Sequence, residues 1–411
     1  MFKLCGKCTC NVYPVCNDTV LRLKDSEMLK RFENRVLLSA PHMSGLEQQH
    51  IQKAFAENWV TPLGPNVTDF EKQVVEYLGE QNLYAVAMSS GTAAIHIALR
   101  LLNVQPNEEI FCSSATFIAS ANPILYEKAI PVFIDSEAAT WNLCPKSLLK
   151  AIEIKKKQGR IPRILICVDL FGMSANYSEI SEICRQYDIR IIEDAAESLG
   201  SSYKNQKCGT FGDYGILSFN GNKIITTSSG GMLLTHTKEE ATKALFFITQ
   251  ARDKAPYYLH SEIGYNYRLS NICAGIGLGQ MSVIEDRVQA RRNIFNIYKE
   301  ILKSSSLKFI EDSADYYSNH WLSTALIPPQ TGKKPSDLIS YLESYNVEAR
   351  HIWKPLHTQP IFKNNEFFQI ESKPISEKIF DEGICLPSCS YMSADTTEQV
   401  CKIIQSFFEH N

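Results

Sequence analysis

Seven short apolar runs, several of them separated by helical patterns, constrain the fold of this 411-residue chain more than any other feature. The runs predict strands at residues 83–88, 109–112, 129–134, 164–169, 189–193, 215–219 and 231–234. Apolar residues at helical spacing predict helices at residues 92–102, 119–126, 146–154 and 178–187. Strands that alternate with helices need crossover connections, which produce a parallel sheet covered on both faces. The sequence therefore predicts an α/β fold with a mainly parallel seven-stranded sheet between helices.

The chain on either side of the predicted sheet suggests two further parts. Residues 1–35 are expected to be a poorly ordered arm, residues 36–285 the large domain, and residues 286–411 a smaller C-terminal α+β domain. A long helix after residue 280 is expected to link the two domains, because it carries an apolar stripe at helical spacing. The stripe consists of Ile284, Val288, Phe295, Tyr298 and Leu302.

The arm contains a cysteine cluster that consists of Cys5, Cys8, Cys10 and Cys16. A CxxC pair invites a zinc interpretation, but no second CxxC and no histidine lies nearby, so we expect no metal. Most of the other cysteines stand singly inside apolar runs, which predicts buried free thiols in a reducing compartment. Examples are Cys112, Cys167, Cys184, Cys273 and Cys401.

Charge and hydropathy exclude some classes of function. The formal net charge is −3 and the pI is near 6.3, which argues against a general nucleic-acid-binding protein. No apolar run reaches the roughly 18 residues that a membrane span needs. We therefore expect a cytoplasmic protein that has no membrane or nucleic-acid partner.

Ligands of such sheets bind beyond the carboxyl ends of the strands, and the first of these ends carries a small polar turn. Ser89, Ser90, Gly91 and Thr92 lie between a predicted strand and a predicted helix. Their backbone N–H groups and hydroxyls could hold a phosphate at the helix N-terminus, although a plain helix cap explains them equally well. Ser218, at another strand end, could donate to the same phosphate.

Two charged residues follow apolar strands. Asp194 ends one strand, where a carboxylate is costly unless it is paired, and a protonated pyridine nitrogen is one good partner. The alternative is an aspartate that caps the next turn, and the neighbouring Glu193 is a rival candidate. Lys223 follows the run at 215–219, where burial would favour a neutral amine that can form a Schiff base. The alternative for Lys223 is a solvated charge in a hairpin.

A phosphate cradle, an aspartate and a lysine at successive strand ends are the three anchors that pyridoxal 5'-phosphate (PLP) needs. At this point the chain resembles the DegT/StrS-type, fold-type-I, PLP-dependent sugar-nucleotide aminotransferases. The resemblance runs from residue 38 to the C-terminus, through motifs such as SSGTAAIHIAL, EDAAESLGS and GTFGDYGILSFNGNKIITTSSGG. It is strongest for enzymes that aminate UDP-4-keto-6-deoxy-N-acetylglucosamine in bacillosamine and exopolysaccharide pathways, through NWVTPLGP, HSEIGYNYRLSN and WKPLHTQPIF.

The resemblance implies a role for each residue that would hold PLP. Lys223 would bind the cofactor covalently and shuttle protons, and Asp194 would pair with the pyridinium nitrogen. Phe117 would stack on the ring face opposite the lysine, although a core aromatic is the alternative. The phosphate would be held by Gly91, Thr92 and Ser218. Glu197 would lie near the phenolic oxygen, where the family often has Gln or His, so we expect its carboxyl group to be hydrogen-bonded or protonated.

Further roles implied by the resemblance involve other parts of the chain. Asn266 would complete the phosphate site of a partner subunit, which implies a homodimer with active sites at the interface. Arg350 or Lys354 would meet the substrate diphosphate and His357 a sugar hydroxyl, while a solvated charge or a satisfied loop histidine is the alternative for each. The family's SGGG is Ser-Ser-Gly-Gly here, so Ser229 would be strained if that position has a positive φ.

The expected reaction is amino transfer from L-glutamate to C4 of a nucleotide-linked 4-keto-6-deoxy sugar, with ping-pong kinetics. The same chemistry on a dTDP- or GDP-linked sugar, or on a 3-keto isomer, is the nearest alternative. A dehydratase of this fold is disfavoured because relatives of that kind have histidine in place of the lysine. A non-catalytic regulatory homologue is the alternative outside the enzymes.

Overall fold

The computed structural model describes residues 29–409. Contacts divide the chain into one unit of residues 1–30 and a second of residues 31–411, and only the second is considered below. The cysteine cluster of the arm lies outside the described residues. The boundary that the sequence predicts near residue 285 stays a prediction. Within the described part of the chain, no helix is both long and apolar enough to cross a membrane.

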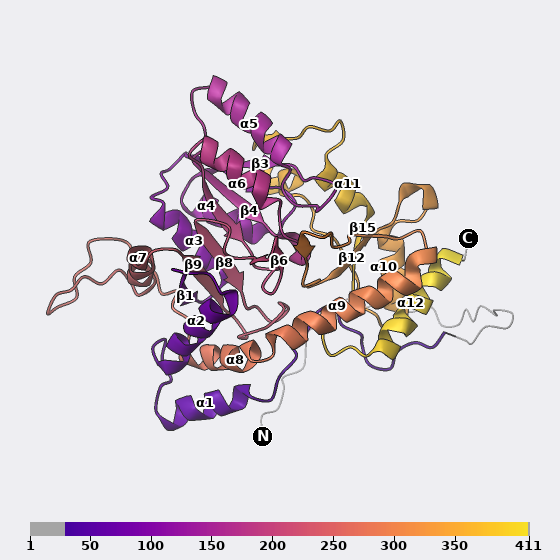
Figure 1. The fold of residues 1–411 in the computed structure, drawn as a ribbon, viewed down its shortest axis with the longest axis horizontal. Helices are drawn as coiled ribbons and strands as arrows, with labels where there is room; N and C mark the ends of the chain where they lie inside the picture. The colour runs from indigo at the N-terminus through magenta and orange to yellow at the C-terminus, as the bar shows by residue number, and fades with distance from the viewer. Residues whose placement is uncertain (1–28, 410–411) are drawn as a thin grey trace, which may run out of the picture. The chain divides into compact units, whose positions relative to one another are not determined.

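A mainly parallel sheet forms the centre of the fold (Figure 1). All seven predicted strands are present within about two residues, and an eighth, β14, pairs with β3 at the edge. Strand β9 runs antiparallel to both its neighbours, and the other pairs are parallel. In spatial order the strands are β1 (Tyr84–Met88), β9 (Gly231–Thr235), β8 (Tyr214–Ser218), β5 (Arg190–Asp194), β4 (Ile164–Val168), β2 (Glu109–Ser113), β3 (Ile130–Ile134) and β14 (Phe367–Phe368).

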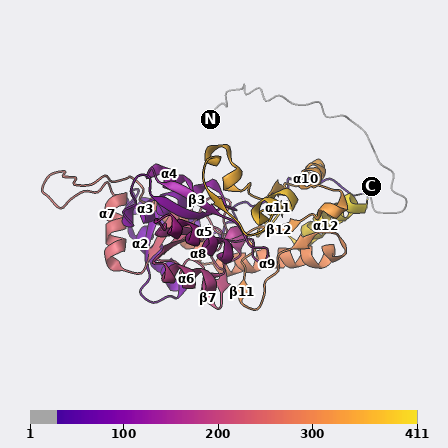
Figure 2. The same cartoon turned by 90° about the horizontal axis from the view of Figure 1, so that it is seen from above.

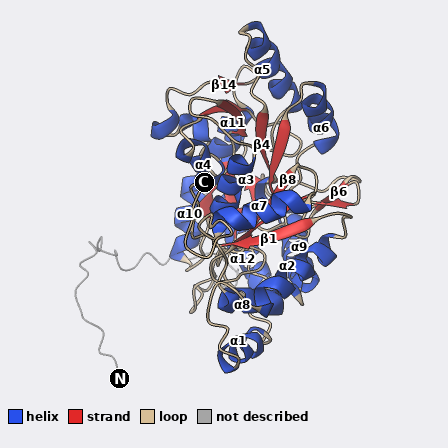
Figure 3. Cartoon of the chain, turned by 90° about the vertical axis from the view of Figure 1, so that its left-hand side faces the viewer, coloured by secondary structure: helices blue, strands red, loops and turns tan. Residues whose placement is uncertain are grey.

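Helices cover both faces of this sheet (Figure 3). Alternate residues of β4 show the two faces, since Ile166 packs into one apolar cluster and Leu165 and Cys167 into another. The first face packs against α3 (Gly91–Leu101), α4 (Asn122–Tyr126) and α7 (Lys238–Ile248). The second packs against α5 (Pro145–Lys157), α6 (Tyr177–Gln186), α2 (Pro65–Leu78) and α8 (Asn271–Met281). This two-sided burial explains why the strands read as nearly continuous apolar runs.

The C-terminal part of the chain follows the long helix α9 (Ile284–Ile301), whose predicted apolar stripe is buried. It contains a four-stranded antiparallel sheet of β10 (Lys308–Phe309), β12 (Ser323–Leu326), β15 (Gly383–Leu386) and β13 (Arg350–His351). The helices α10 (Pro335–Ser344) and α12 (Ala394–Glu409) lie together, away from α7 (Figure 2), and α11 (Ile375–Glu382) packs beside β15.

The remaining elements are short. A three-stranded sheet joins β11 (Tyr316–Tyr317), β6 (Ser202–Tyr203) and β7 (Gln206–Lys207). Single 3-10 turns are η1 (Ile118–Ser120), η2 (Leu170–Gly172), η3 (Leu302–Ser304), η4 (Pro329–Thr331), η5 (Leu356–Thr358) and η6 (Pro360–Phe362). Of the cysteines that the sequence analysis singled out inside apolar runs, all but Cys273 are fully buried, and all are free thiols.

The first helix, α1 (Glu47–Ala56), is anchored to α8 by a buried carboxylate. Ser44 and Glu47 stand three residues apart, a spacing typical of a capping box. The Glu47 carboxylate accepts the N–H groups of Ser44 and Gly45 at 2.8 and 2.9 Å, and the side-chain amide of Gln280 at 2.5 Å. Burial acts to raise the pKa of Glu47, but hydrogen bonds led by those of Ser44 and Gln280 outweigh it and lower the pKa to about 2.

We expect Glu47→Gln to destabilise the protein by about 1–3 kcal/mol near neutral pH, because three donors lose a charged acceptor. A carboxylate whose pKa is depressed on folding stabilises the protein above its unfolded pKa, and this contribution disappears as pH falls through the folded pKa. Urea denaturation should therefore show the full difference above about pH 4.5 and almost none near pH 2. Glu57→Gln, at the exposed end of α1, is the control. An equal loss at both pH values would contradict this account.

Candidate active site

One cavity lies at the carboxyl ends of the strands β5 and β8. Seven residues that the sequence analysis assigned to the cofactor line it together. They are Gly91, Thr92, Phe117, Asp194, Glu197, Ser218 and Lys223. The strands explain the convergence, since Asp194 ends β5, Ser218 ends β8, and β1 leads into the turn before α3. The predicted meeting of these residues is therefore present in the structure.

The turn before α3 is both a helix cap and a set of free donors. Ser90 caps the helix, and its Oγ accepts the Ala93 N–H at 3.1 Å. The N–H groups of Gly91 and Thr92 belong to the first turn, where an α-helix offers no internal acceptor. Ser89 fixes the turn from the other side, since its N–H donates to the Tyr267 carbonyl at 2.7 Å. The cap and the anion cradle, posed as alternatives, are thus compatible.

Asp194 lines the cavity and is 5% exposed. Its Oδ2 accepts the Ser120 hydroxyl at 2.6 Å and its Oδ1 accepts the Ala196 N–H at 3.3 Å. Burial raises the pKa of Asp194, while the Ser120 hydrogen bond and the charge of Lys223 act in the opposite direction. The rival residue Glu193 does not line the cavity.

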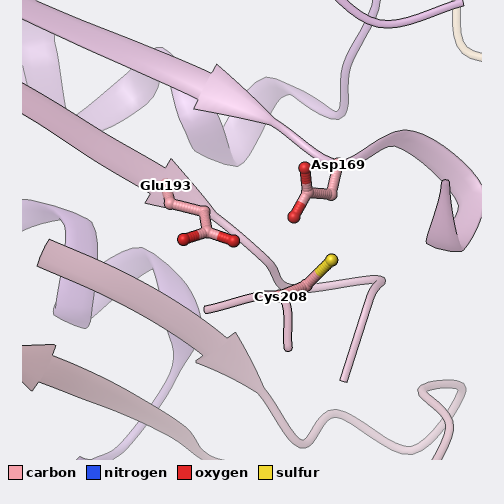
Figure 4. A group of neighbouring side chains, drawn as sticks. All are labelled: Asp169, Glu193 and Cys208. Atoms are coloured by element: carbon pink, nitrogen blue, oxygen red, sulfur yellow. The ribbon is translucent and has the colours of Figure 1, made fainter. Parts of the chain in front are cut away.

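Glu193 instead belongs to a buried group with Asp169 and Cys208 (Figure 4). Its two oxygens accept the backbone N–H groups of Gly209, Phe211 and Gly212, and Asp169 accepts from Ala175, Tyr177 and Ser198. Burial raises the pKa of Glu193 and brings that of Asp169 to about 6. Because every carboxyl oxygen already has a donor, we interpret the group as a hydrogen-bonded carboxyl pair and assign no metal to it.

Lys223 is enclosed, which argues against the solvated-hairpin alternative. Its side chain is 12% exposed, and its Nζ lies 3.5 Å from Glu197 Oε1 and 4.2 Å from the centroid of the Trp321 ring. The other Glu197 oxygen accepts the Phe171 N–H at 2.7 Å, and the Phe171 ring stacks on Trp321. Burial raises the pKa of Glu197, and Lys223 and the Phe171 N–H oppose this shift. Glu197 is thus hydrogen-bonded, as expected.

Phe117 is unusually exposed for an aromatic residue inside a fold. The residue lines the cavity and is 52% exposed, and its ring centroid lies 5.3 Å from that of Trp353. A core aromatic would be covered, so this exposure favours the stacking role over the core alternative.

The other predicted site residues do not line this cavity. Asn266 is exposed and forms a backbone bridge with Thr249, and Lys354 is exposed. Arg350 is 68% exposed and donates to Glu348 at 2.7 Å. The ring of His357 is nearly buried, with Ser114 Oγ at 2.6 Å from Nδ1 and Glu377 at 3.1 Å from Nε2.

Two details differ from what the sequence alone indicated. The positive φ in the Ser-Ser-Gly-Gly segment is at Ser228 (φ 70°), so backbone strain falls one residue before Ser229. Ser120, Trp321 and Phe171 were not singled out as site residues. Ser120 follows Phe117 within one turn, a signal that could have found it, but only tertiary structure brings Trp321 to the lysine and Phe171 to Glu197.

Comparisons with known proteins agree with this geometry. The model of the DegT/DnrJ/EryC1/StrS aminotransferase family matches residues 41–405. EpsN of Bacillus subtilis (strain 168), named as a candidate pyridoxal phosphate-dependent aminotransferase, is 50% identical over 91% of this chain and 96% of its own. GDP-perosamine synthase of Escherichia coli O157:H7 is 33% identical over 90% of this chain and 97% of its own.

A solved structure extends the comparison to the fold. The crystal structure of a DegT DnrJ EryC1 StrS aminotransferase from Brucella abortus superposes with a TM-score of 0.82 at 30% identity, covering 89% of this chain and 95% of that one. The expected fold type is thereby confirmed. This chain belongs to the DegT/DnrJ/EryC1/StrS family and is a PLP-dependent sugar aminotransferase.

Proposed function

We propose that this enzyme transfers the amino group of L-glutamate to C4 of UDP-4-keto-6-deoxy-N-acetylglucosamine, a step toward a bacillosamine-type amino sugar. The observation that supports the proposal most is the convergence of Lys223, Asp194 and the N-terminus of α3 in one cavity. The UDP-linked sugar itself rests on the motifs NWVTPLGP, HSEIGYNYRLSN and WKPLHTQPIF.

The charges that line the cavity suit PLP. Two buried carboxyl groups, Asp194 and Glu197, face a single cationic side chain, Lys223, among the described residues of the cavity wall. A cationic pyridine ring would balance this excess of negative charge. Beside the turn before α3, β9 packs so closely that a Cβ at Gly231 would collide with the Ser90–Gly91 peptide. The residues present therefore fit the cofactor.

Each residue then has a defined task. PLP, when bound, supplies the electron sink that stabilises negative charge at the carbon from which a proton is removed. Lys223 Nζ anchors the cofactor and moves the proton, since it is enclosed and lies beside Glu197. Asp194 keeps the ring nitrogen protonated, and Phe117 covers one ring face. The first-turn N–H groups of α3 and the Ser218 hydroxyl hold the phosphate.

The nucleotide has one competing candidate. The 33% identical relative is named a GDP-perosamine synthase, which favours a GDP-linked sugar as the second possibility. In either case Arg350 and Lys354 supply exposed positive charge for a diphosphate. For His357 we now favour a bracing role, because both ring nitrogens already have protein partners.

Asn266 would act in a second copy of the chain. It is exposed and does not line the cavity of its own chain, yet Tyr267 beside it is held against the phosphate turn by the Ser89 N–H. A homodimer that places Asn266 in the neighbouring phosphate site would use this exposure.

The close approach of β9 to the phosphate turn can be tested by mutation. Gly231→Ala should weaken PLP binding about tenfold or more, because the added methyl group displaces the Gly91 and Thr92 N–H donors. The dissociation constant is measured by titrating cofactor-free protein and following visible absorbance. Gly221→Ala is the control, since its Cβ would meet only Pro41, at 3.9 Å. Equal affinities for the two variants would exclude this packing constraint.

A direct assay of the reaction products tests the proposed substrate. Purified protein is incubated with PLP, L-glutamate and either the UDP-linked or a GDP-linked 4-keto-6-deoxy sugar, and products are identified by mass. We expect an amino sugar from the UDP-linked substrate with wild type and with Lys299→Ala, a surface lysine paired with Glu311, and none with Lys223→Ala. Product from the GDP-linked sugar alone would reject the UDP assignment. The absence of both an amino-sugar product and a spectral response to glutamate would indicate a non-catalytic homologue.

Mixed dimers test whether Asn266 completes the phosphate site of the partner subunit. Lys223→Ala and Asn266→Ala chains carrying different tags are combined, and the mixed dimer is isolated. If Asn266 serves the partner, one site of the mixed dimer contains both an intact Lys223 and an intact Asn266, so activity returns although each parent dimer is impaired. If Asn266 acts within its own chain, each site of the mixed dimer lacks one of the two residues, and activity stays low.

A further inference from the structure

Two buried hydroxyl groups are hydrogen-bonded in series to Asp194. The Thr116 Oγ1 lies 2.8 Å from the Ser120 Oγ, which lies 2.6 Å from Asp194 Oδ2. Thr116 and Ser120 are 3% and 1% exposed, so solvent does not compete for these bonds. Both residues also line the cavity.

The chemistry of the groups determines which atom donates each of these two hydrogen bonds. An ionised carboxylate only accepts hydrogen bonds, and a serine hydroxyl has one proton to give. The Ser120 proton therefore points to Asp194, and the Ser120 oxygen accepts the Thr116 proton. If Asp194 were protonated, it could donate to Ser120 instead, and the direction of both hydrogen bonds could reverse. The hydrogen-bond pattern is thus coupled to the charge of Asp194.

The same short segment carries the ring-stacking residue. Thr116 precedes Phe117, and the Ser120 N–H donates to the Phe117 carbonyl at 3.2 Å at the 3-10 turn η1. One turn of chain therefore presents an aromatic face to the cavity and a hydroxyl to the carboxylate at its wall. A shift of this turn would move both contacts together.

We propose that Ser120 is a positioning residue that holds the Asp194 carboxylate in place and keeps it ionised, and that Thr116 orients the Ser120 hydroxyl. The inference rests on the proposed role of Asp194 as partner of the pyridinium nitrogen. A hydrogen bond of 2.6 Å to a carboxylate has the short length typical of a charge-assisted bond. Neither hydroxyl needs to touch the reacting atoms to have this effect.

The electrostatic surroundings determine the direction of the expected change. Burial raises the pKa of Asp194, and the Ser120 hydrogen bond, the charge of Lys223 and the Ala196 N–H lower it. The other titratable groups that face it are Glu197 and the buried thiol of Cys112. Removing the Ser120 donor should raise the pKa of Asp194. Because only the ionised form stabilises a pyridinium, cofactor binding should then begin to fail at a higher pH on acidification.

The test measures PLP affinity of cofactor-free protein by visible absorbance across a pH series. Ser120→Ala should weaken binding about tenfold near neutral pH, which corresponds to about 1.4 kcal/mol, and should move the acidic midpoint upward. Thr116→Val, which is nearly isosteric, should weaken binding about threefold and move the midpoint in the same direction. Thr116→Ser restores the hydroxyl and should behave like wild type.

Two further variants separate the possible outcomes. Ser147→Ala removes a buried hydroxyl of α5 away from the cavity and should leave both affinity and midpoint unchanged. Ser120→Ala added to Asp194→Asn should cause no further loss, because the acceptor charge is already gone. A loss in Ser120→Ala without a midpoint shift, or a full loss in the double variant, would overturn the inference. Wild-type affinity in Asp194→Asn would instead overturn the proposed role of Asp194.

Discussion

Carboxyl groups buried at the C-terminal ends of two adjacent strands are the constraint on which this structure depends. The strand β4 leads into Asp169, and β5 ends with Glu193 and Asp194, followed by Glu197. All four carboxyl groups are at most 5% exposed. Ionised carboxylates in such a place are costly unless donors or cations surround them. The local backbone and its nearest side chains supply those donors in two separate ways.

On the face turned away from the cavity, donors within the fold satisfy the buried carboxyl groups completely. Glu193 and Asp169 are saturated by backbone N–H groups and hydroxyls, so this pair demands nothing from outside. On the cavity side the solution is partial, because Asp194 and Glu197 share one lysine. The imbalance creates a preference for a cationic ligand. Adjacent residues of a single strand, Glu193 and Asp194, thus meet two different environments because their side chains point to opposite faces.

Features with a local sequence signal could be predicted, whereas contacts between distant segments could not. Strand runs and the polar residues at their ends are local signals, and Lys223, Asp194 and the turn before α3 were found from them. The two-residue strand β14 carries no periodicity, so the eighth strand could not be predicted. Trp321 reaches Lys223, and Phe171 reaches Glu197, from distant segments, and Phe171 does so with a positive φ of 54° that no sequence pattern marks. His357 looked like a surface ligand because its partners Ser114 and Glu377 are distant in sequence.

The contacts of His357 also connect the loop after β13 to the segment beside the cavity. Ser114 lies two residues before Thr116, and it binds both the ring of His357 and, through its carbonyl, the Leu356 N–H at 2.8 Å. The loop after β13 is thereby tied to the segment that carries Phe117 and Ser120. Lys354, in this loop, and Arg350, in β13, remain exposed. Changes at these exposed side chains would therefore leave the hydrogen bonds that brace the segment with Phe117 and Ser120 in place.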